Sequence, residues 1–434
     1  MVDAAEIKIW NQLVGAVRWD EATQLASFEF SPTFLSKRID LSPVKMPLTN
    51  GSRIYRFPEL RTQREDSYDT FKGLPGLLAD ALPDRYGNQL MNIWLNQQGR
   101  PENSMNPVEQ LCFMGERGMG ALEFEPAQLP SRNQTFKIEV NGLVEVAHRM
   151  LNQKESFKAD LSKDERETLQ QILKVGTSAG GARPKAVIAY NPVTGGVRSG
   201  QINAPKGYEH WLLKLDGVSD AQFGESSGWG RIEYAYYLMA SSCGIEMMES
   251  RLLEENGRAH FMTKRFDRSG SDIKHHVQTL CGLQHYDYNL RGTFSYEQVF
   301  QTMRLLRLTY PDAEQMFRRM VFNVLARNCD DHTKNFAFIL KKGGSWQLSP
   351  AYDICYAYRP DSYWVNNQTM LVRSKQENIT KEDFLSIAKE NSIKKAPQII
   401  EEIQGAIQQW PAFAKEAGIQ LRTIQAIQKT FPKV

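Results

Sequence analysis

The sequence predicts an α+β protein in which short strands are frequent in the first part of the chain and helices dominate the last part. Three stretches between residues 5 and 30 (EIKIW, LVGAVRW and LASFEF) are predicted to form a small antiparallel sheet, with alternation clearest at Ile7 and Ile9. After Phe294, apolar residues recur at three- and four-residue spacing, which is typical of helices. The segments with this spacing are DAEQMFRRMVFNVLARN, KEDFLSIAKEN, QIIEEIQGAIQQW and RTIQAIQKTF.

Length and composition are those of a soluble globular protein, because 434 residues can form two or three domains and 24% of them are charged. A net charge of +3 is too small to indicate nucleic-acid binding by itself. The five cysteines are scattered without a C-x-x-C pair, which favours free thiols over zinc or disulfides. No run approaches a membrane span and the N-terminus lacks a signal-peptide pattern, so we expect a cytoplasmic protein with no membrane partner.

The N-terminal region continues with helical patterns. Residues 73–95 are predicted to be helical, with Pro75 and Pro83 as helix starts or breaks, and PVEQLCFM forms another short helix. The glycine-rich segment 115–122 has nothing basic at the spacing of a phosphate loop, which favours a tight turn into the strand ALEF. Residues 1–130 therefore predict an α+β module, with a boundary at 126–134.

A loop of small residues, VGTSAGGARPKAVIAY (175–190), follows a helix that Ser162 and Glu165 are predicted to cap and that ends near Lys174. Glycines let backbone amides approach a phosphate, and successive N–H groups form an anion-binding nest. The P-loop pattern G-x-x-x-x-G-K-[ST] is absent, and an ordinary loop-to-strand turn is the alternative.

Lys214 lies inside the apolar strand HWLLKLDG (210–217), where a lysine needs an anionic partner. In protein kinases a strand lysine binds the α- and β-phosphates and pairs with a helix glutamate; here Glu233, in the helical segment 231–245, is the natural partner. The alternative is an edge-strand lysine whose ammonium reaches solvent. Asn256-Gly257 then predicts a hairpin.

The stretch 321–357 organises the rest of the chain. An apolar helix leads into a polar loop (NCDDHTKN), and the strands FAFIL and SWQL follow, joined by Lys341-Lys342-Gly343-Gly344. Protein kinases place a catalytic Asp and a metal-binding Asn as D-x-x-x-x-N, then a strand pair, then a second metal-binding Asp. Asp330, Asn335 and Asp353 have this order and spacing. Asp331 leaves only three residues before Asn335, so Asp330 is preferred; a polar capping loop is the alternative reading.

The motif order and several local segments resemble the HipA family of serine/threonine kinases, the toxin half of HipA–HipB modules. The segments are LPGLLADALPDRYG, PVEQLCFMGERGMGALEFEP, TSAGGARPKA, LLKLD, KRFDR, DDHTKNF, SPAYDI and ITKEDFLSIA. This resemblance covers nearly the whole chain. It implies a divergent protein-kinase-like two-lobe fold, with a small antiparallel barrel in the N-terminal α/β part and an all-helical C-terminal lobe. The expected parts are residues 1–130, an ATP-binding part at 131–268, and a mainly helical part at 269–434 with the catalytic loop.

The resemblance also implies ATP and Mg²⁺ as cofactors. Asp330 would be catalytic, Asn335 and Asp353 would bind magnesium, and Lys214 would bind phosphate. The remaining expected ATP-binding residues are Gly180, Gly181, Ala182, Arg183, Lys185, Lys264, Arg265, Phe266, His332, Lys334 and Tyr352.

Regulation and partners are implied in the same way. Ser178 aligns with an autophosphorylated loop serine whose dianion would clash with bound phosphates and inactivate the enzyme. The expected partner is a helix-turn-helix antitoxin that links the kinase to operator DNA. The expected substrate is an aminoacyl-tRNA synthetase, whose phosphorylation stalls translation and favours persistence. Lys389 falls in a segment that weakly resembles a DNA-contacting surface; a solvated basic face is the alternative.

One departure from the family concerns Asp331, where many relatives have glycine between the aspartate and the histidine. We expect its carboxylate either to crowd the metal or to point to solvent. Two other functions are considered: a catalytically weak nucleotide-binding corepressor, and a metal-dependent phosphodiesterase using Asp330, Asp331, His332 and Asp353.

Overall fold

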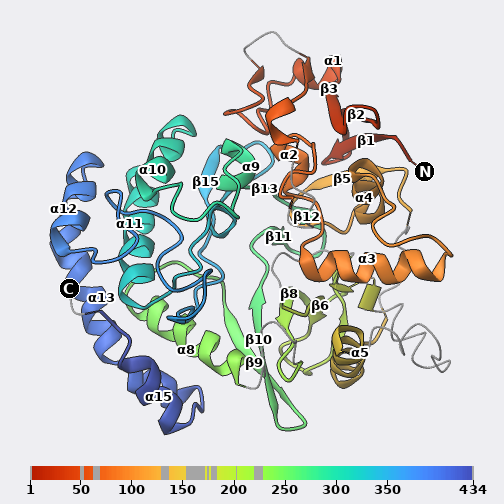
Figure 1. The fold of residues 1–434 in the computed structure, drawn as a ribbon. Coiled ribbons are helices and arrows are strands. Elements are labelled where there is room, and N and C mark those ends of the chain that lie inside the picture. Colours follow the sequence, from red (N-terminus) through yellow and green to blue (C-terminus); the bar gives the residue numbers. More distant parts are fainter. Residues whose placement is uncertain are drawn as a thin grey trace. The chain divides into compact units, whose positions relative to one another are not determined.

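The computed structural model describes residues 2–48, 53–61, 69–128, 136–152, 172–173, 175–176, 183–201, 203–218 and 228–432. The chain divides into two compact units (Figure 1). The first unit contains Met1–Ser42, Met46–Gly230 and Arg251–Val277, and the second contains Pro43–Lys45, Arg231–Ser250 and Gln278–Val434. The predicted three-part division remains a prediction. The predicted helix cap at Ser162 and Glu165, Ser178 and the loop residues 180–182 lie outside the described residues.

The first sheet confirms the antiparallel arrangement predicted for residues 5–30. Its strand order is β4-β3-β2-β1-β5. The strands are β1 (Ala4–Ile9), β2 (Gln12–Asp20), β3 (Leu25–Phe30), β4 (Ile54–Tyr55) and β5 (Leu122–Glu125). Their inward residues, among them Ile7, Val14 and Phe28, are fully buried, as the alternation requires.

Short helices follow the first sheet where proline and capping residues place them. They are α1 (Pro32–Leu35), η2 (Pro58–Leu60), α2 (Gly76–Ala79), α3 (Arg85–Gln97) and α4 (Pro107–Met114). Pro75 is the N-cap of α2, and Asp84 caps α3 by accepting a hydrogen bond from the Gly87 N–H at 2.7 Å. The prolines therefore act as predicted.

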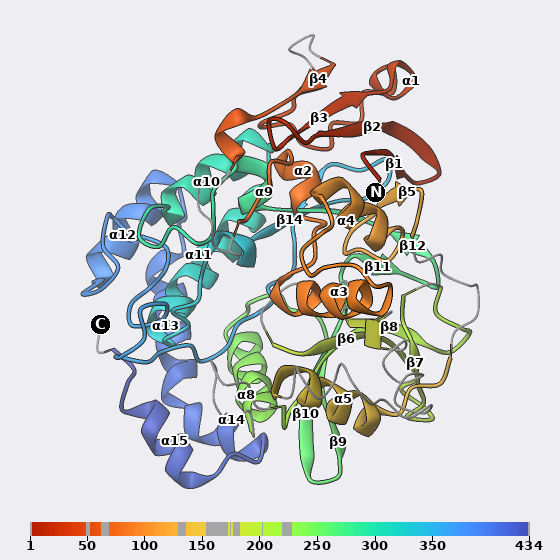
Figure 2. The ribbon, with the colours of Figure 1, turned by 45° about the vertical axis from the view of Figure 1, so that its right-hand side comes forward.

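The second sheet of this unit has the order β7-β6-β8-β10-β9. The strands are β6 (Lys185–Tyr190), β7 (Val197–Ser199), β8 (Glu209–Lys214), β9 (Ser250–Glu255) and β10 (Arg258–Lys264). Helices α3 and α5 (Val140–Asn152) supply apolar residues to the core beside it (Figure 2). The turn between β9 and β10 has positive φ at Asn256 (45°) and Gly257 (77°), which confirms the predicted hairpin.

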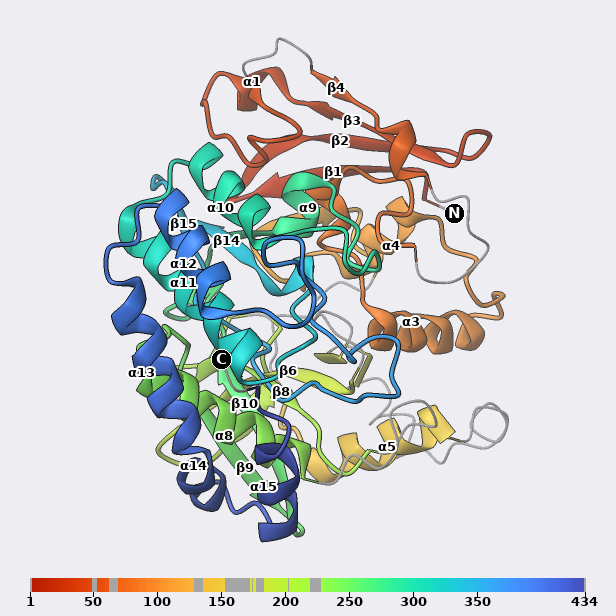
Figure 3. The same cartoon turned by 60° about the vertical axis from the view of Figure 1, so that its left-hand side comes forward.

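The second unit is mainly helical. Its helices are α8 (Trp229–Ser242, of which the first two residues belong to the first unit), α9 (Leu280–Gln284), α10 (Tyr296–Leu305), α11 (Tyr310–Leu325), η3 (Thr333–Asn335), α12 (Lys381–Glu390), α13 (Ala396–Gln408), α14 (Trp410–Glu416) and α15 (Leu421–Gln428). Helix α11 packs against α13, and α12 to α15 follow one another along one side of the unit (Figure 3). Thr380 and Asp383 form the reciprocal cap of α12 that their spacing predicts.

Short strands complete both units. The predicted pair β14 (Ala337–Leu340) and β15 (Trp346–Leu348) is antiparallel, with Phe338 opposite Leu348. A small ribbon is formed by β11 (Arg268–Ser269) and β12 (Ile273–Lys274), and β13 (His276–Thr279) carries the chain into the second unit. Among the described residues, no helix has the length and apolar character needed to cross a membrane.

Candidate active site

The loop after α11 is fastened to the segment that follows the strand pair. Asn328 and Ala357 form a parallel bridge. The Ala357 N–H donates to the Arg327 carbonyl at 3.0 Å, and the Cys329 N–H donates to the Ala357 carbonyl at 3.2 Å. The two segments that carry Asp330 and Asp353 therefore run together within the second unit.

The two adjacent aspartates of this loop face opposite ways. The Asp330 side chain is 55% exposed, whereas Asp331 is fully buried. Asp331 Oδ1 accepts the N–H groups of Thr369 (2.8 Å) and Met370 (3.3 Å), and its Oδ2 accepts the Tyr296 hydroxyl (2.7 Å) and the Gln368 amide (3.2 Å).

Our expectation for Asp331 was wrong, because its carboxyl neither crowds a metal ion nor points to solvent. Both of its oxygens are held inside the unit by groups that come from α10 and from residues 368–370. Burial raises the pKa of Asp331 to about 7, although the hydrogen bonds from Tyr296, Thr369 and Met370 act in the opposite direction. Asp331 braces the loop, and Asp330 is the exposed member of the pair.

Asn335 is held at the other end of the motif by a single 3₁₀ turn, η3. Its N–H donates to the His332 carbonyl at 2.8 Å, and its side-chain Nδ2 donates to the Asp330 carbonyl at 2.6 Å. Thr333 anchors the turn by donating its hydroxyl to the Tyr286 carbonyl at 2.8 Å. These bonds fix the spacing between Asp330 and Asn335.

Asp353 has a left-handed backbone conformation, with φ of 52°. Such a conformation in a residue other than glycine stores strain and is found mostly where the surroundings enforce it. The neighbouring Tyr352 donates its hydroxyl to the Lys334 carbonyl at 2.6 Å, which ties the Asp353 segment to the loop a second time. The structure therefore brings Asp330, Asn335 and Asp353 onto one framework of two linked segments.

His332 and Lys334 flank a tyrosine ring. The Tyr288 ring centroid lies 5.2 Å from that of His332 and 4.6 Å from the Lys334 ammonium. His332 Nε2 is 3.9 Å from Asp330 Oδ1. His332 therefore lies close to Asp330, and Lys334 lies over the same tyrosine ring as His332.

The donor set of these segments fits magnesium. Mg²⁺ binds through one or two carboxylates and substrate phosphates and keeps several waters, so it does not need a cage of protein ligands. Asn335 and Asp353 offer hard oxygen atoms, and the Asn335 amide is already oriented through its Nδ2. Within the described ranges, no cluster of three or more His, Cys, Asp or Glu residues is suited to holding a metal ion.

The predicted phosphate lysine lies in the first unit, at the end of β8. Lys214 stands directly opposite Lys185 of β6 on one side and Phe261 of β10 on the other. Its ammonium lies 5.8 Å from the centroid of the Phe261 ring. Lys185 is only 2% exposed, and its ammonium lies 3.2 Å from Asp84 Oδ2. Arg183, at the start of this segment, stacks over Trp229 at 4.3 Å.

The predicted adenine-facing segment 264–266 is held by ion pairs. Lys264 Nζ donates to Glu209 Oε1 at 2.6 Å, and Arg265 makes a bidentate contact with Asp267 at 2.7 and 2.8 Å. Asp267 is fully buried and also accepts from Arg268 (2.6 Å) and from the Gly120 N–H (2.7 Å). The Lys264 and Arg265 side chains are thus engaged in ion pairs, and the contact of the Lys264–Phe266 backbone with adenine remains a prediction.

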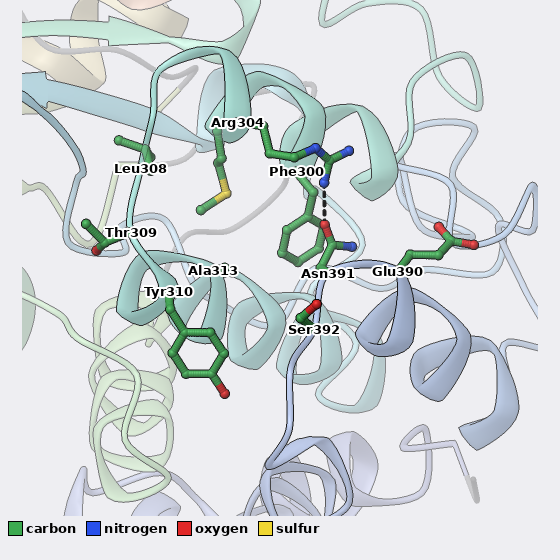
Figure 4. A pocket seen from close by; sticks show the side chains of 10 residues that line it. Phe300, Arg304, Leu308, Thr309, Tyr310, Ala313, Glu390, Asn391 and Ser392 are labelled. Atoms are coloured by element: carbon green, nitrogen blue, oxygen red, sulfur yellow. Dashed lines mark hydrogen bonds between the residues drawn. The ribbon is translucent and has the colours of Figure 1, made fainter.

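Two further expectations, the pairing of Lys214 with Glu233 and the DNA contact of Lys389, remain predictions. Lys214 and Glu233 belong to different units, so their pairing remains a prediction. Lys389 lies exposed in the last turn of α12. The next residue, Glu390, lines a cavity of about 280 Å³ together with other residues from α10, α11 and α12 (Figure 4). Arg304 of this lining donates a hydrogen bond from its guanidinium to Asn391 Oδ1 at 2.6 Å. This cavity contains none of the predicted site residues.

Sequence reasoning missed three contributors to these segments: Asp84, Asp267 and the brace around Asp331. Asp84 and Lys185 are 101 residues apart in the chain, and Asp331 and Tyr296 are 35 apart. A buried-type lysine signals that some acid must lie nearby, but its spacing cannot identify which one.

The protein is an α+β protein. Its mainly helical unit carries the candidate site, in which acidic residues lie on the loop after α11 and on the segment after β15. Residues 177–410 match the family of the HipA-like C-terminal domain, and residues 5–125 match the HipA N-terminal domain. The chain therefore belongs to the HipA family, as its motifs predict.

One solved structure confirms the predicted fold class over nearly the whole chain. HipA of Shewanella oneidensis MR-1, solved with HipB and its operator DNA, is similar with a TM-score of 0.66 at 15% identity, over 98% of this chain and 95% of that chain. The Helicobacter pylori proinflammatory kinase CtkA has a TM-score of 0.36 at 15% identity, over 58% of this chain and 90% of that chain.

Proposed function

We propose that this chain is an ATP-dependent serine/threonine protein kinase of a toxin–antitoxin module. The observation that carries the proposal is the pair of linked segments that exposes Asp330 and keeps Asn335 and Asp353 on the same framework. Membership of the HipA family supports it. The order of these residues is the order in which kinases present a catalytic aspartate and two magnesium ligands.

In the proposed reaction, the hydroxyl of a serine or threonine attacks the γ-phosphorus of ATP. The bond to the bridging oxygen breaks, ADP leaves, and Asp330 takes the hydroxyl proton. Lys214 holds the phosphates, while Asn335 and Asp353 would hold Mg²⁺, which neutralises charge that develops on the phosphates. The Gly180–Lys185 loop would cover the phosphates, and the backbone of Lys264–Phe266 would face adenine.

Partners are proposed from the family. A HipB-like helix-turn-helix antitoxin would bind the kinase and link it to operator DNA, with Lys389 as a weak candidate for DNA contact. The protein substrate would be an aminoacyl-tRNA synthetase. Co-expression with a helix-turn-helix protein encoded beside this gene tests the first point: failure to co-purify with it would refute the assignment.

Autophosphorylation provides the sharpest test of activity. We expect purified protein with labelled ATP and Mg²⁺ to incorporate phosphate at Ser178, located by mass spectrometry, and Asp330→Asn to reduce the rate by at least about 10²-fold. Asp361→Asn, which changes an exposed aspartate of the same unit, is the matched control and keeps the wild-type rate. Phosphate incorporation by Asp330→Asn at the wild-type rate would contradict the proposal.

The two other functions predict different results. A nucleotide-binding corepressor would occupy operator DNA with its antitoxin but transfer no phosphate, in the wild type as in Asp330→Asn. A metal-dependent phosphodiesterase would need Asp331 as a ligand, and that carboxyl is turned into the core. No observation favours either over the kinase.

A further inference from the structure

The loop 358–367 leaves the candidate site and returns to it. Before the loop, the Ala357 carbonyl accepts the Cys329 N–H at 3.2 Å. After the loop, the Thr369 N–H donates to the Cys329 carbonyl at 3.2 Å, and the Thr369 hydroxyl donates to the same carbonyl at 2.9 Å. Both ends of the loop are therefore fixed to the residue that immediately precedes Asp330.

Two aromatic side chains stand at the tip of this loop. Tyr363 is 68% exposed and Trp364 is 44% exposed. Their rings pack edge to face, with centroids 5.3 Å apart. Large rings gain stabilisation when they leave water, and at interfaces tyrosine and tryptophan are enriched among the residues that carry the binding energy. We call this pair the aromatic tip.

Arg291 holds the aromatic tip from outside the loop. Its guanidinium donates to the Tyr363 carbonyl and to Asn366 Oδ1 at 3.1 Å, and it lies 5.3 Å from the centroid of the Tyr363 ring. Within the loop, the Arg359 N–H donates to the Val365 carbonyl at 3.1 Å. The backbone of the tip is therefore fixed before any partner binds, which lowers the entropy lost on binding.

The segment that contains Arg291 also contacts the loop that carries Asp330. Tyr288 precedes Arg291 by three residues, and its ring centroid lies 5.2 Å from that of His332. His332 Nε2 is in turn 3.9 Å from Asp330 Oδ1. One short stretch of chain thus connects the aromatic tip with the surroundings of the exposed Asp330 carboxylate.

The aromatic tip lies within the reach of a protein bound at Asp330. An extended chain spans at most about 3.6 Å per residue, so Tyr363 lies no more than about 18 Å from Gln368, five residues further on. The Gln368 amide donates to Asp331, the neighbour of Asp330, at 3.2 Å. An ordinary interface takes about 800 Å² from each partner, a disc about 16 Å in radius. The two lengths are comparable.

We propose that Tyr363 and Trp364 form the docking anchor for the protein substrate, which places an apolar patch on the two rings while its serine or threonine meets Asp330. This inference rests on the proposed function and deepens it. The reaction itself brings a protein to this place, and the aromatic tip contacts that protein rather than ATP. Docking of the substrate protein is therefore separable from nucleotide binding.

The test compares Tyr363→Ala/Trp364→Ala with the wild-type full chain. Each phosphorylates a soluble cell extract of the source organism with labelled ATP and Mg²⁺, with and without RNase treatment. Because each substrate protein is dilute, initial rates report kcat/KM. We expect the double variant to label protein bands at least about 30-fold more slowly, the scale of one dominant interface side chain. The Kd for Mg·ATP from isothermal titration should not change.

Two control variants accompany this comparison. Tyr363→Phe/Trp364→Phe keeps an aromatic ring at each position and should retain most of the wild-type rate. Leu421→Ala removes an apolar side chain that is 61% exposed at the start of α15 in the same unit, and it should leave the rate unchanged. Melting temperatures verify that each variant is folded.

The outcomes separate this inference from the kinase proposal. If wild type labels no protein, the proposed function fails. If wild type and the double variant label the same bands at the same rate, the docking role is wrong. A parallel loss of Mg·ATP affinity would show that the aromatic tip only supports the nucleotide site, and a loss confined to the untreated extract would assign it to RNA. A wild-type dimer that becomes monomeric in the double variant would assign it to a contact between copies. Each of these results overturns the inference.

Discussion

Asp330 and Asp331 are adjacent in the chain but differ in environment, and the difference assigns their roles. The first carboxylate is exposed at the loop, where it can accept a proton from a substrate hydroxyl. The second accepts four hydrogen bonds inside the unit, including one from Tyr296, which in turn accepts from the Asn323 amide at 3.0 Å. In the proposed reaction Asp330 therefore takes the proton, while Asp331 supports the loop.

The buried position of Asp331 predicts a pH-dependent contribution to stability. Burial raises its pKa from 3.8 to about 7, so folding favours the protonated form. The stabilisation is fully present below about pH 4 and is lost as the pH rises through 7. The asparagine of Asp331→Asn is neutral at every pH. We therefore expect the free energy of unfolding of the wild type, relative to that of Asp331→Asn, to fall by roughly 2–3 kcal/mol between pH 5 and pH 8.

Urea unfolding of both proteins across this pH range measures the effect. Taking the difference between the two removes the opposing contributions of buried histidines such as His276, whose pKa burial lowers to about 4. A difference that stays constant with pH would mean that the Asp331 carboxyl is ionised throughout.

At the scale of elements, the ion pairs around Asp267 join the connector after β10 to the turn before β5. Asp267 binds both Arg265 and Arg268, and Arg268 also donates to the Gly118 and Gly120 carbonyls. Burial alone would raise the pKa of Asp267, but the two guanidinium groups outweigh it and hold that pKa well below its usual range.

Asp267→Asn is therefore expected to destabilise the first unit by about 3–5 kcal/mol, because it leaves two buried guanidinium groups without their counter-charge. Denaturant unfolding followed by intrinsic fluorescence measures the loss. Asp272→Asn, at an exposed aspartate of the adjoining turn, is the control and should change stability by less than about 0.5 kcal/mol. An equally small loss of stability in Asp267→Asn would show that the buried ion pairs contribute little to the stability of the first unit.

Local chemistry made many elements predictable. Asn256-Gly257 dictates its hairpin because both residues tolerate positive φ, and the Thr380–Asp383 spacing satisfies two N–H groups at the start of α12. The D-x-x-x-x-N spacing likewise identified the loop. The direction of Asp331 was not predictable, because its partners Tyr296 and Thr369 meet it only in the folded chain. Asp84 was missed for the same reason.

At the scale of the whole molecule, the proposed ATP residues are divided between the two units. Lys214, Lys185 and the Lys264–Phe266 backbone belong to the first, and Asp330, Asn335 and Asp353 belong to the second. Neither unit by itself contains all of the residues proposed for ATP binding. We therefore expect activity to require both units.

A crystal structure of the full chain with Mg²⁺ and a non-hydrolysable ATP analogue tests the central claim most directly. We predict the triphosphate bound to Lys214, with a magnesium ion at Asn335 and Asp353 and the γ-phosphate facing Asp330. Nucleotide bound elsewhere, for example in the cavity between α10 and α12, or none bound at saturating concentration, would contradict the account.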